Sequence, residues 1–125
     1  MKMNWGRVVN AGLVAEILLL LVYQLTVQQL GRGTASNLVV IVGCFVFMLV
    51  GALWVGRDIE SRFVLHGFLV GVVAVVYYVI RSLPDAISGQ YPMNYWQAAL
   101  WGHTPKLLGG IVGGYIAGKL KTKAD

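Results

Sequence analysis

Charged residues are scarce in this sequence of 125 residues. Asp, Glu, Lys and Arg make up 12% of the chain, hydrophobic residues make up 58%, and the mean hydropathy is +0.71. A soluble domain averages about 25% charged and about 45–50% apolar residues. Because so short a chain cannot bury this much apolar surface within itself, the composition excludes an ordinary soluble domain and a disordered chain. It indicates a lipid bilayer as the solvent.

Cysteine and histidine are also rare. The chain has one cysteine, Cys44, and two histidines, His66 and His103. A single cysteine forms no intramolecular disulfide, which excludes a disulfide scaffold, and no CxxC or HxxxH spacing is present. We therefore expect no metal site and no cofactor. The sequence also lacks a phosphate-binding loop, a dinucleotide fingerprint and a nucleophile–base set, so we expect no enzymatic activity.

Four apolar segments have the length of membrane-spanning helices, or nearly so: residues 8–27, 38–56, 63–80 and 104–120. A spanning helix needs about 20 mostly apolar residues, and the last segment, of some 17 residues, reaches roughly 25 Å of a 30 Å core. Thr104 and Pro105 provide a cap and a first-turn proline for it. The predicted fold class is all-α: a single transmembrane domain over residues 1–125, folded as a four-helix bundle.

Residues 81–103, between the third and fourth segments, are too polar to span. This segment holds four aromatic residues that we expect to act as interfacial anchors: Tyr91, Tyr95, Trp96 and Trp101. Trp and Tyr side chains favour the headgroup level, where the ring is half buried and its donor stays hydrated. We therefore expect an outer loop that lies on the membrane surface, with a short interfacial helix over residues 95–101. His103 and Lys106 would flank the outer end of the last helix, with Lys106 snorkelling to the interface.

The basic residues are unevenly divided between the two ends of the predicted helices. Seven lie at the end with both termini, and three (Arg32, Arg81 and Lys106) lie at the other. The positive-inside rule therefore places both termini and the charged turn at residues 57–62 in the cytoplasm. That turn is most simply solvated and self-neutralising. Because the basic residues form no patch with interleaved aromatics, we expect the bilayer, and no nucleic acid, as a partner.

Glycines recur at four-residue spacing in the third and fourth predicted spans. Such GxxxG pairs let two membrane helices approach closely. The glycines of this predicted helix-packing interface are Gly67, Gly71, Gly109, Gly110, Gly113, Gly114 and Gly118. Two interpretations stay open: packing within one chain, or contact with another copy or another membrane protein.

The ends of the second and fourth spans have similar sequences. Residues 51–57 and 113–119 share a small pair, three apolar residues, a glycine and a cation, at an offset of 62 positions. Both segments would run in the same direction across the membrane. This similarity favours two helical hairpins related as a parallel repeat.

Glu16 is a charged residue well inside the first predicted span, roughly 13 Å beyond Arg7. A charge at that depth costs at least a few kcal/mol, so the carboxyl group must be neutral, paired or in contact with water. Glu16 is thus a candidate proton or ion site, with Tyr23 on the same helix face as a possible partner. Tyr77, Tyr78 and Tyr115 are alternative partners, and a protonated or hydrogen-bonded structural glutamate is the alternative role. His66, about one turn inside the third span, either titrates or binds a backbone carbonyl.

Two resemblances support a membrane protein. Residues 4–9, 51–57, 63–71 and 106–119 together resemble small four-helix bacterial membrane proteins of uncharacterised function, a resemblance that covers most of the chain. It implies the bacterial inner membrane and a four-helix fold, and it brings no known activity and no known functional residues. Trp5, Ala15 and Glu16 also resemble the first helix of small multidrug exporters, which carries a membrane-embedded glutamate. The third span lacks the aromatic-glycine signature of that family, and the long outer loop has no counterpart there.

These observations lead to two functional hypotheses. The first is a non-enzymatic membrane protein that acts through helix packing, as a homo-oligomer or as a small accessory subunit of a larger membrane complex. The alternative is a proton-coupled small transporter or ion pathway centred on Glu16.

Overall fold

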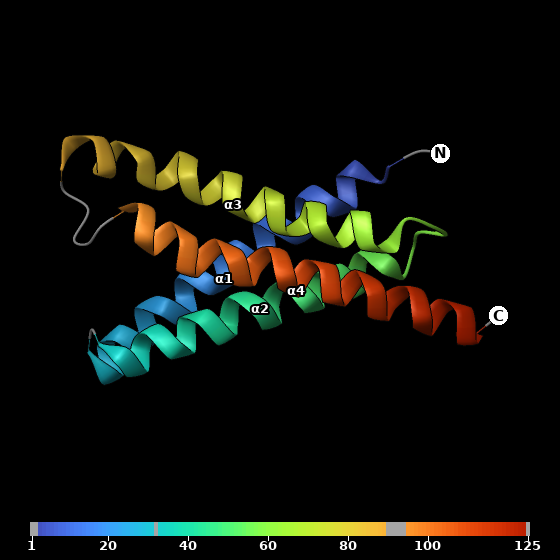
Figure 1. Ribbon diagram of the computed structural model, residues 1–125, viewed down its shortest axis with the longest axis horizontal. Coiled ribbons are helices and arrows are strands. Elements are labelled where there is room, and N and C mark those ends of the chain that lie inside the picture. Colours follow the sequence, from blue (N-terminus) through green and yellow to red (C-terminus); the bar gives the residue numbers. More distant parts are fainter. Residues whose placement is uncertain (1–2, 32, 90–94, 125) are drawn as a thin grey trace.

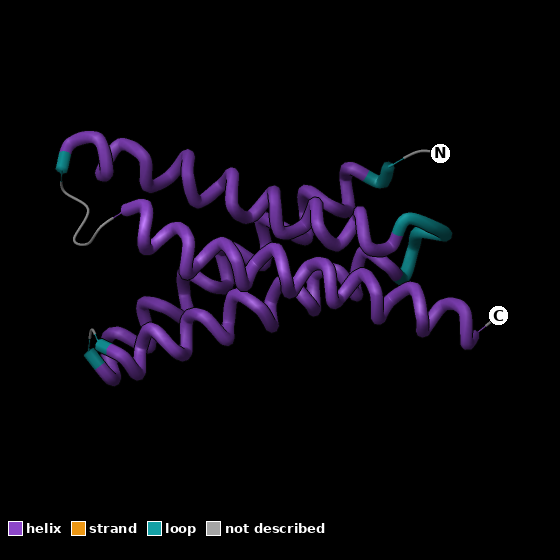
Figure 2. Tube along the Cα trace, in the orientation of Figure 1, coloured by secondary structure: helices purple, strands orange, loops and turns teal. Residues whose placement is uncertain are grey.

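The chain folds into four α-helices, and the computed structural model describes residues 3–31, 33–89 and 95–124. The helices are α1 (Trp5–Leu30), α2 (Thr34–Gly56), α3 (Phe63–Ser88) and α4 (Tyr95–Ala124) (Figure 1). Helix makes up nearly all of the described chain, as Figure 2 shows. The side chains of residues 34, 95–101 and 124 are outside this description.

Three of the four helices are long and apolar enough to cross a membrane by length and composition. They cover Trp5–Leu30, Ala35–Gly56 and Phe63–Ser88, with mean hydropathies of 2.0, 2.8 and 2.3. The α4 helix is not among the three. Its glycines and its charged residues, Lys106 and Lys119 among them, lower its hydropathy.

The helices lie side by side along their length. α4 packs against both α2 and α3, and α1 packs against the same two helices from the other side. The backbones of α1 and α4 do not approach each other closely, so these two helices form a diagonal pair. Both termini and the connection between α2 and α3 lie at one end, which we call the terminal end, and the other two connections lie at the opposite end (Figure 1).

An apolar core fills the half of the molecule nearest the terminal end. Val8 of α1, Met48 and Val55 of α2 and Val70 of α3 have no exposed surface. Many large apolar side chains on the outer faces of the helices are exposed instead, as expected where lipid replaces water as the solvent.

The contact between α3 and α4 is made by backbone atoms. A Cβ atom on Gly67 would overlap the carbonyl oxygen of Gly110, and one on Gly110 would overlap that of Gly67. One turn further along α3, a Cβ atom on Gly71 would lie 2.8 Å from the carbonyl oxygen of Lys106. Any larger residue at these positions therefore moves the two helices apart.

The contact between α2 and α4 uses the other glycine row of α4. Cβ atoms on Gly109 and Gly113 would overlap the carbonyl oxygens of Phe45 and Leu49. The two glycine rows of α4 thus face two different helices of the same chain. Packing within the chain therefore accounts for the GxxxG pairs of α4.

The expected surface loop over residues 81–103 is corrected by the structure. α3 continues through Pro84 to Ser88, and α4 begins at Tyr95 and continues through Pro105. A proline removes one backbone donor, and apolar helices tolerate it where neighbouring groups compensate. The connection is therefore limited to residues 89–94, and the predicted short helix is the start of α4.

The expected interfacial anchors cannot be compared with the structure. Tyr91 lies outside the described residues, as do the side chains of Tyr95, Trp96 and Trp101. Their anchoring role stays a prediction.

We expect Gly110→Ala to destabilise the fold by about 1–3 kcal/mol, the usual cost of overpacking, because the new methyl group meets the backbone of α3. Gly102→Ala is the matched control, since it lies in the same helix with nothing within 4 Å of the added Cβ. It should be neutral or slightly stabilising. Thermal unfolding in detergent, followed by circular dichroism, measures both. Equal stability of the two variants would contradict the close contact.

Candidate functional site

Glu16 of α1 and Lys106 of α4 form an ion pair in the interior. Lys106 Nζ lies 2.9 Å from Glu16 Oε2, and the side chains are 4% and 2% exposed. Among the described residues, Oε2 receives no hydrogen bond of normal geometry, so the contact is mainly Coulombic. Glu16 is the twelfth of 26 residues in α1, close to the middle of that helix. The pair thus lies at mid-length of the apolar helices, where an unpaired charge is most costly.

This ion pair connects the two helices whose backbones stay apart. α1 and α4 lie diagonally opposite, and their charged side chains extend toward each other across the interior. The close approach of Gly71 to the backbone of Lys106 sets the position of α4 at this level. The glycine contact between α3 and α4 therefore determines where the ammonium group lies.

Side chains from the remaining two helices surround the ion pair. The ring of Tyr78 in α3 lies 4.8 Å from Lys106 Nζ, within the range of a cation–π contact. Cys44 of α2 is buried and lies close enough to interact electrostatically with both Lys106 and Glu16. All four helices therefore contribute to this charged centre.

The polar surroundings of the pair extend toward the opposite end. His103 contacts the ring of Tyr78 edge-on, with centroids 4.9 Å apart, and the Arg81 guanidinium lies 5.4 Å from the same ring. Both ring nitrogens of His103 are buried and, within the described part of the chain, have no hydrogen-bond partner. Toward the terminal end the pair meets the apolar core instead. The polar neighbours of the pair therefore lie toward the opposite end, whereas buried apolar residues such as Val8 and Leu19 lie on both sides of it.

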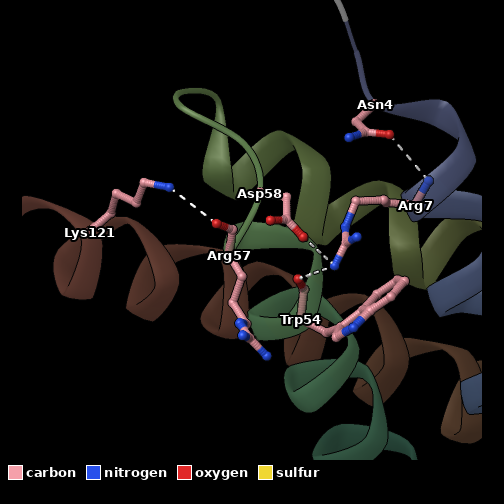
Figure 3. Close-up of polar contacts among 6 residues, drawn as sticks. All are labelled: Asn4, Arg7, Trp54, Arg57, Asp58 and Lys121. Atoms are coloured by element: carbon pink, nitrogen blue, oxygen red, sulfur yellow. Dashed lines mark hydrogen bonds and ion pairs between the residues drawn. The ribbon is translucent and has the colours of Figure 1, made fainter.

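A second set of polar contacts joins three segments at the terminal end (Figure 3). Arg7 of α1 lies 2.6 Å from Asp58, donates to the carbonyl oxygen of Trp54 at 3.2 Å and stacks over its ring at 3.8 Å. Lys121 of α4 donates to the carbonyl oxygen of Arg57 at 3.1 Å. The turn at residues 57–62 is therefore not simply self-neutralising, because Asp58 pairs with α1. This partly exposed pair contributes little energy, about 0–1 kcal/mol.

His66 belongs to the terminal end and not to the charged centre. It is buried, its Nε2 accepts from the backbone N–H of Asn4 at 3.2 Å, and its Nδ1 donates to the carbonyl oxygen of Arg62 at 2.8 Å. These partners identify the neutral ring with its proton on Nδ1. Asn4 is 12 residues from Glu16, roughly 18 Å along the helix. The structure therefore does not bring His66 and Glu16 together.

Lys106 is the charged partner of Glu16 in the structure. Tyr23 is half buried, and within the described residues no hydrogen bond joins it to Glu16. Lys106, expected to snorkel at the outer end, is buried instead, because α4 begins 11 residues before it. The signal that could have predicted this pairing was a single glutamate inside the first apolar segment and a lysine inside the last one.

Comparisons with known proteins add no information on this site. No family model, no curated protein and no solved structure matches the chain. In the described residues, no group of three His, Cys, Asp or Glu side chains is arranged to hold a metal ion.

We expect Glu16→Gln and Lys106→Met each to lower the free energy of unfolding by about 3–5 kcal/mol, because each leaves one buried charge without its partner. The double variant should lose much less than the sum, since it leaves no unpaired charge. Unfolding in detergent gives all three values. Glu60→Gln, at an exposed carboxylate, is the control and should change nothing. Additive losses in the double variant would show that the two side chains are not coupled.

Proposed function

We propose that the chain is a non-enzymatic multi-pass membrane protein, and that the Glu16–Lys106 pair is the site of a proton-coupled carrier for a small cation. The observation that carries this proposal is the buried ion pair at mid-length of the helices. Ionisable residues inside membrane helices are rare, and they mark ion and proton pathways where they occur. Three helices with the length and composition of membrane spans support the location.

The fourth helix is proposed to cross the membrane as well, in a four-helix bundle. α4 packs along both α2 and α3, so it covers the same distance as two apolar helices (Figure 1). Lys106 is one of the residues that lower its hydropathy, but it is buried, is paired with Glu16 and does not face lipid. With the basic residues concentrated at the terminal end, the positive-inside rule favours a bacterial inner membrane protein with both termini in the cytoplasm.

Competition for one carboxylate would couple cation movement to proton movement. A proton on Glu16 removes the negative partner of Lys106 and leaves one uncompensated charge in a low-dielectric interior, which favours separation of α1 from α4. A small cation that reaches ionised Glu16 competes with Lys106 and with the proton for the same oxygens. Because His103 and Tyr78 extend the polar surroundings toward the opposite end, exchange is proposed to occur with that side.

The packing hypothesis has less support from the geometry. It rests on the glycine faces, on the expected aromatic surface loop and on the lack of catalytic residues in the sequence. Four of the glycines in α4 (Gly109, Gly110, Gly113 and Gly114) contact α2 and α3 of the same chain, so no outside partner is needed to explain them. A role as a homo-oligomer or accessory subunit stays a prediction from the sequence.

Flux measurements in vesicles test the proposal. The purified protein is reconstituted with a pH-sensitive dye inside, and gradients of sodium, potassium or a quaternary ammonium ion are imposed. We expect the wild-type protein to move protons in response to at least one gradient, and the Glu16→Gln/Lys106→Met variant to abolish this movement. This variant is chosen because it is expected to stay folded.

Glu60→Gln is the control and should retain the wild-type flux, since its carboxylate is exposed and outside the charged centre. Wild-type vesicles that behave like empty ones for all three cations would contradict a carrier of such ions. Unchanged flux in the double variant would contradict the assignment of the site to Glu16 and Lys106.

A further inference from the structure

A groove at the terminal end lies between the start of α3 and the end of α4. Its volume is about 530 Å³. The residues that line it are Arg62, Phe63, Val64, Leu65, Gly114, Tyr115, Gly118, Lys119 and Thr122. The groove is separate from the Glu16–Lys106 pair, and neither the ion pair nor the helix packing requires it.

The groove combines cationic and apolar groups. Arg62 and Lys119 are exposed on its rim, while Val64, Leu65 and Tyr115 add exposed apolar surface, with fractions of 43%, 40% and 57%. A membrane-embedded face that carries both kinds of group matches an amphipathic molecule with an anionic head and apolar chains.

The charges at the terminal end are segregated between two hollows. The two acidic residues of the turn, Asp58 and Glu60, line a different hollow beside the start of α1, together with Trp5. The groove between α3 and α4 has no acidic residue in its lining. The charges in its lining, those of Arg62 and Lys119, are therefore both positive.

The backbone at the rim favours an anion as well. Arg62 precedes α3 with φ of +56°, and its own side chain does not cap this helix start. The first-turn N–H groups carry the positive end of the helix dipole, so they add to the attraction that Arg62 and Lys119 exert. The helix dipole adds to the attraction of an anion by the two cationic side chains, and these side chains are still required.

We propose that this groove binds an anionic glycerophospholipid of the adjacent leaflet, with the phosphate between Arg62 and Lys119 and an acyl chain along Val64, Leu65 and Tyr115. Basic pockets between membrane helices at the cytoplasmic side recognise anionic headgroups by this chemistry. The inference rests on the proposed membrane location and not on the proposed transport.

Native mass spectrometry of the delipidated full-length protein in detergent tests the site. Phosphatidylglycerol and phosphatidylcholine are titrated separately, so that acyl chains are matched and only the headgroup charge differs. We expect phosphatidylglycerol to bind the wild-type protein more tightly than phosphatidylcholine. The variant Arg62→Asn/Lys119→Gln should weaken this binding roughly 25-fold, about a factor of five for each cation. Asn is chosen at position 62 because it tolerates a left-handed backbone.

The matched control is Arg57→Gln/Lys123→Gln, which removes two charges from the same end but outside the groove lining. It should change phosphatidylglycerol binding less than twofold. If both double variants lost phosphatidylglycerol binding equally, the binding would reflect general attraction by the basic terminal end, and the proposal would be overturned. Equal binding of the two lipids would also overturn it.

Two further outcomes separate other occupants from a lipid. Displacement of phosphatidylglycerol by millimolar inorganic phosphate would assign the groove to a free anion and overturn the lipid proposal. A dimer that the groove variant abolishes would assign the groove to a second copy, with the same consequence. Neither result depends on whether the protein transports a cation.

Discussion

Direct backbone contact between α4 and its two neighbours is the constraint on which the rest of the structure depends. Gly110 and Gly67 touch through backbone atoms, and a turn away Gly71 meets the backbone of Lys106. In lipid, where apolar side chains gain little by leaving their solvent, such close van der Waals contact is a main force between helices. It also fixes the height of α4 along α3, and with it the position of the Lys106 ammonium group.

The ion pair is a consequence of that register. Glu16 and Lys106 come from helices whose backbones do not approach each other closely, so their attraction links the two helices directly across the diagonal. A buried pair of this kind adds little net stability compared with apolar residues, but the loss of one partner is very costly. The interior therefore tolerates the pair only while both charges are present. This condition is the basis of the proposed response of α1 and α4 to a proton on Glu16.

Local signals in the sequence predict much of the fold, but they give the wrong position for Lys106, one of the two residues of the ion pair. Hydrophobic runs indicate four helices, and glycine spacing indicates close packing at Gly67, Gly71 and Gly110. Glu16 stands out as a charge within an apolar run. Thr104 and Pro105 resemble a helix start, which predicts Lys106 at the membrane surface, whereas the structure continues α4 from Tyr95 through both residues.

The other differences between the sequence predictions and the structure also arise from contacts between distant parts of the chain. The pairing of Arg7 with Asp58, and of Glu16 with Lys106, joins residues far apart in the chain, and only tertiary packing brings them together. Capping and turn signals describe a residue's immediate neighbours and carry no information on such contacts. Charge balance does predict such a contact, because a carboxylate and an ammonium group in separate apolar segments are stable there only as partners.

Infrared spectroscopy of the membrane-reconstituted protein tests most directly whether Glu16 is held as a charged partner of Lys106. Subtraction of the Glu16→Gln spectrum isolates the carboxyl band of Glu16. We expect an ionised carboxylate band at neutral pH in the wild-type protein. In Lys106→Met it should be replaced by a protonated carboxyl band, because a lone buried carboxylate takes up a proton. A protonated carboxyl band already in the wild-type protein, or a carboxylate band that persists in Lys106→Met, would contradict an ion pair at this centre.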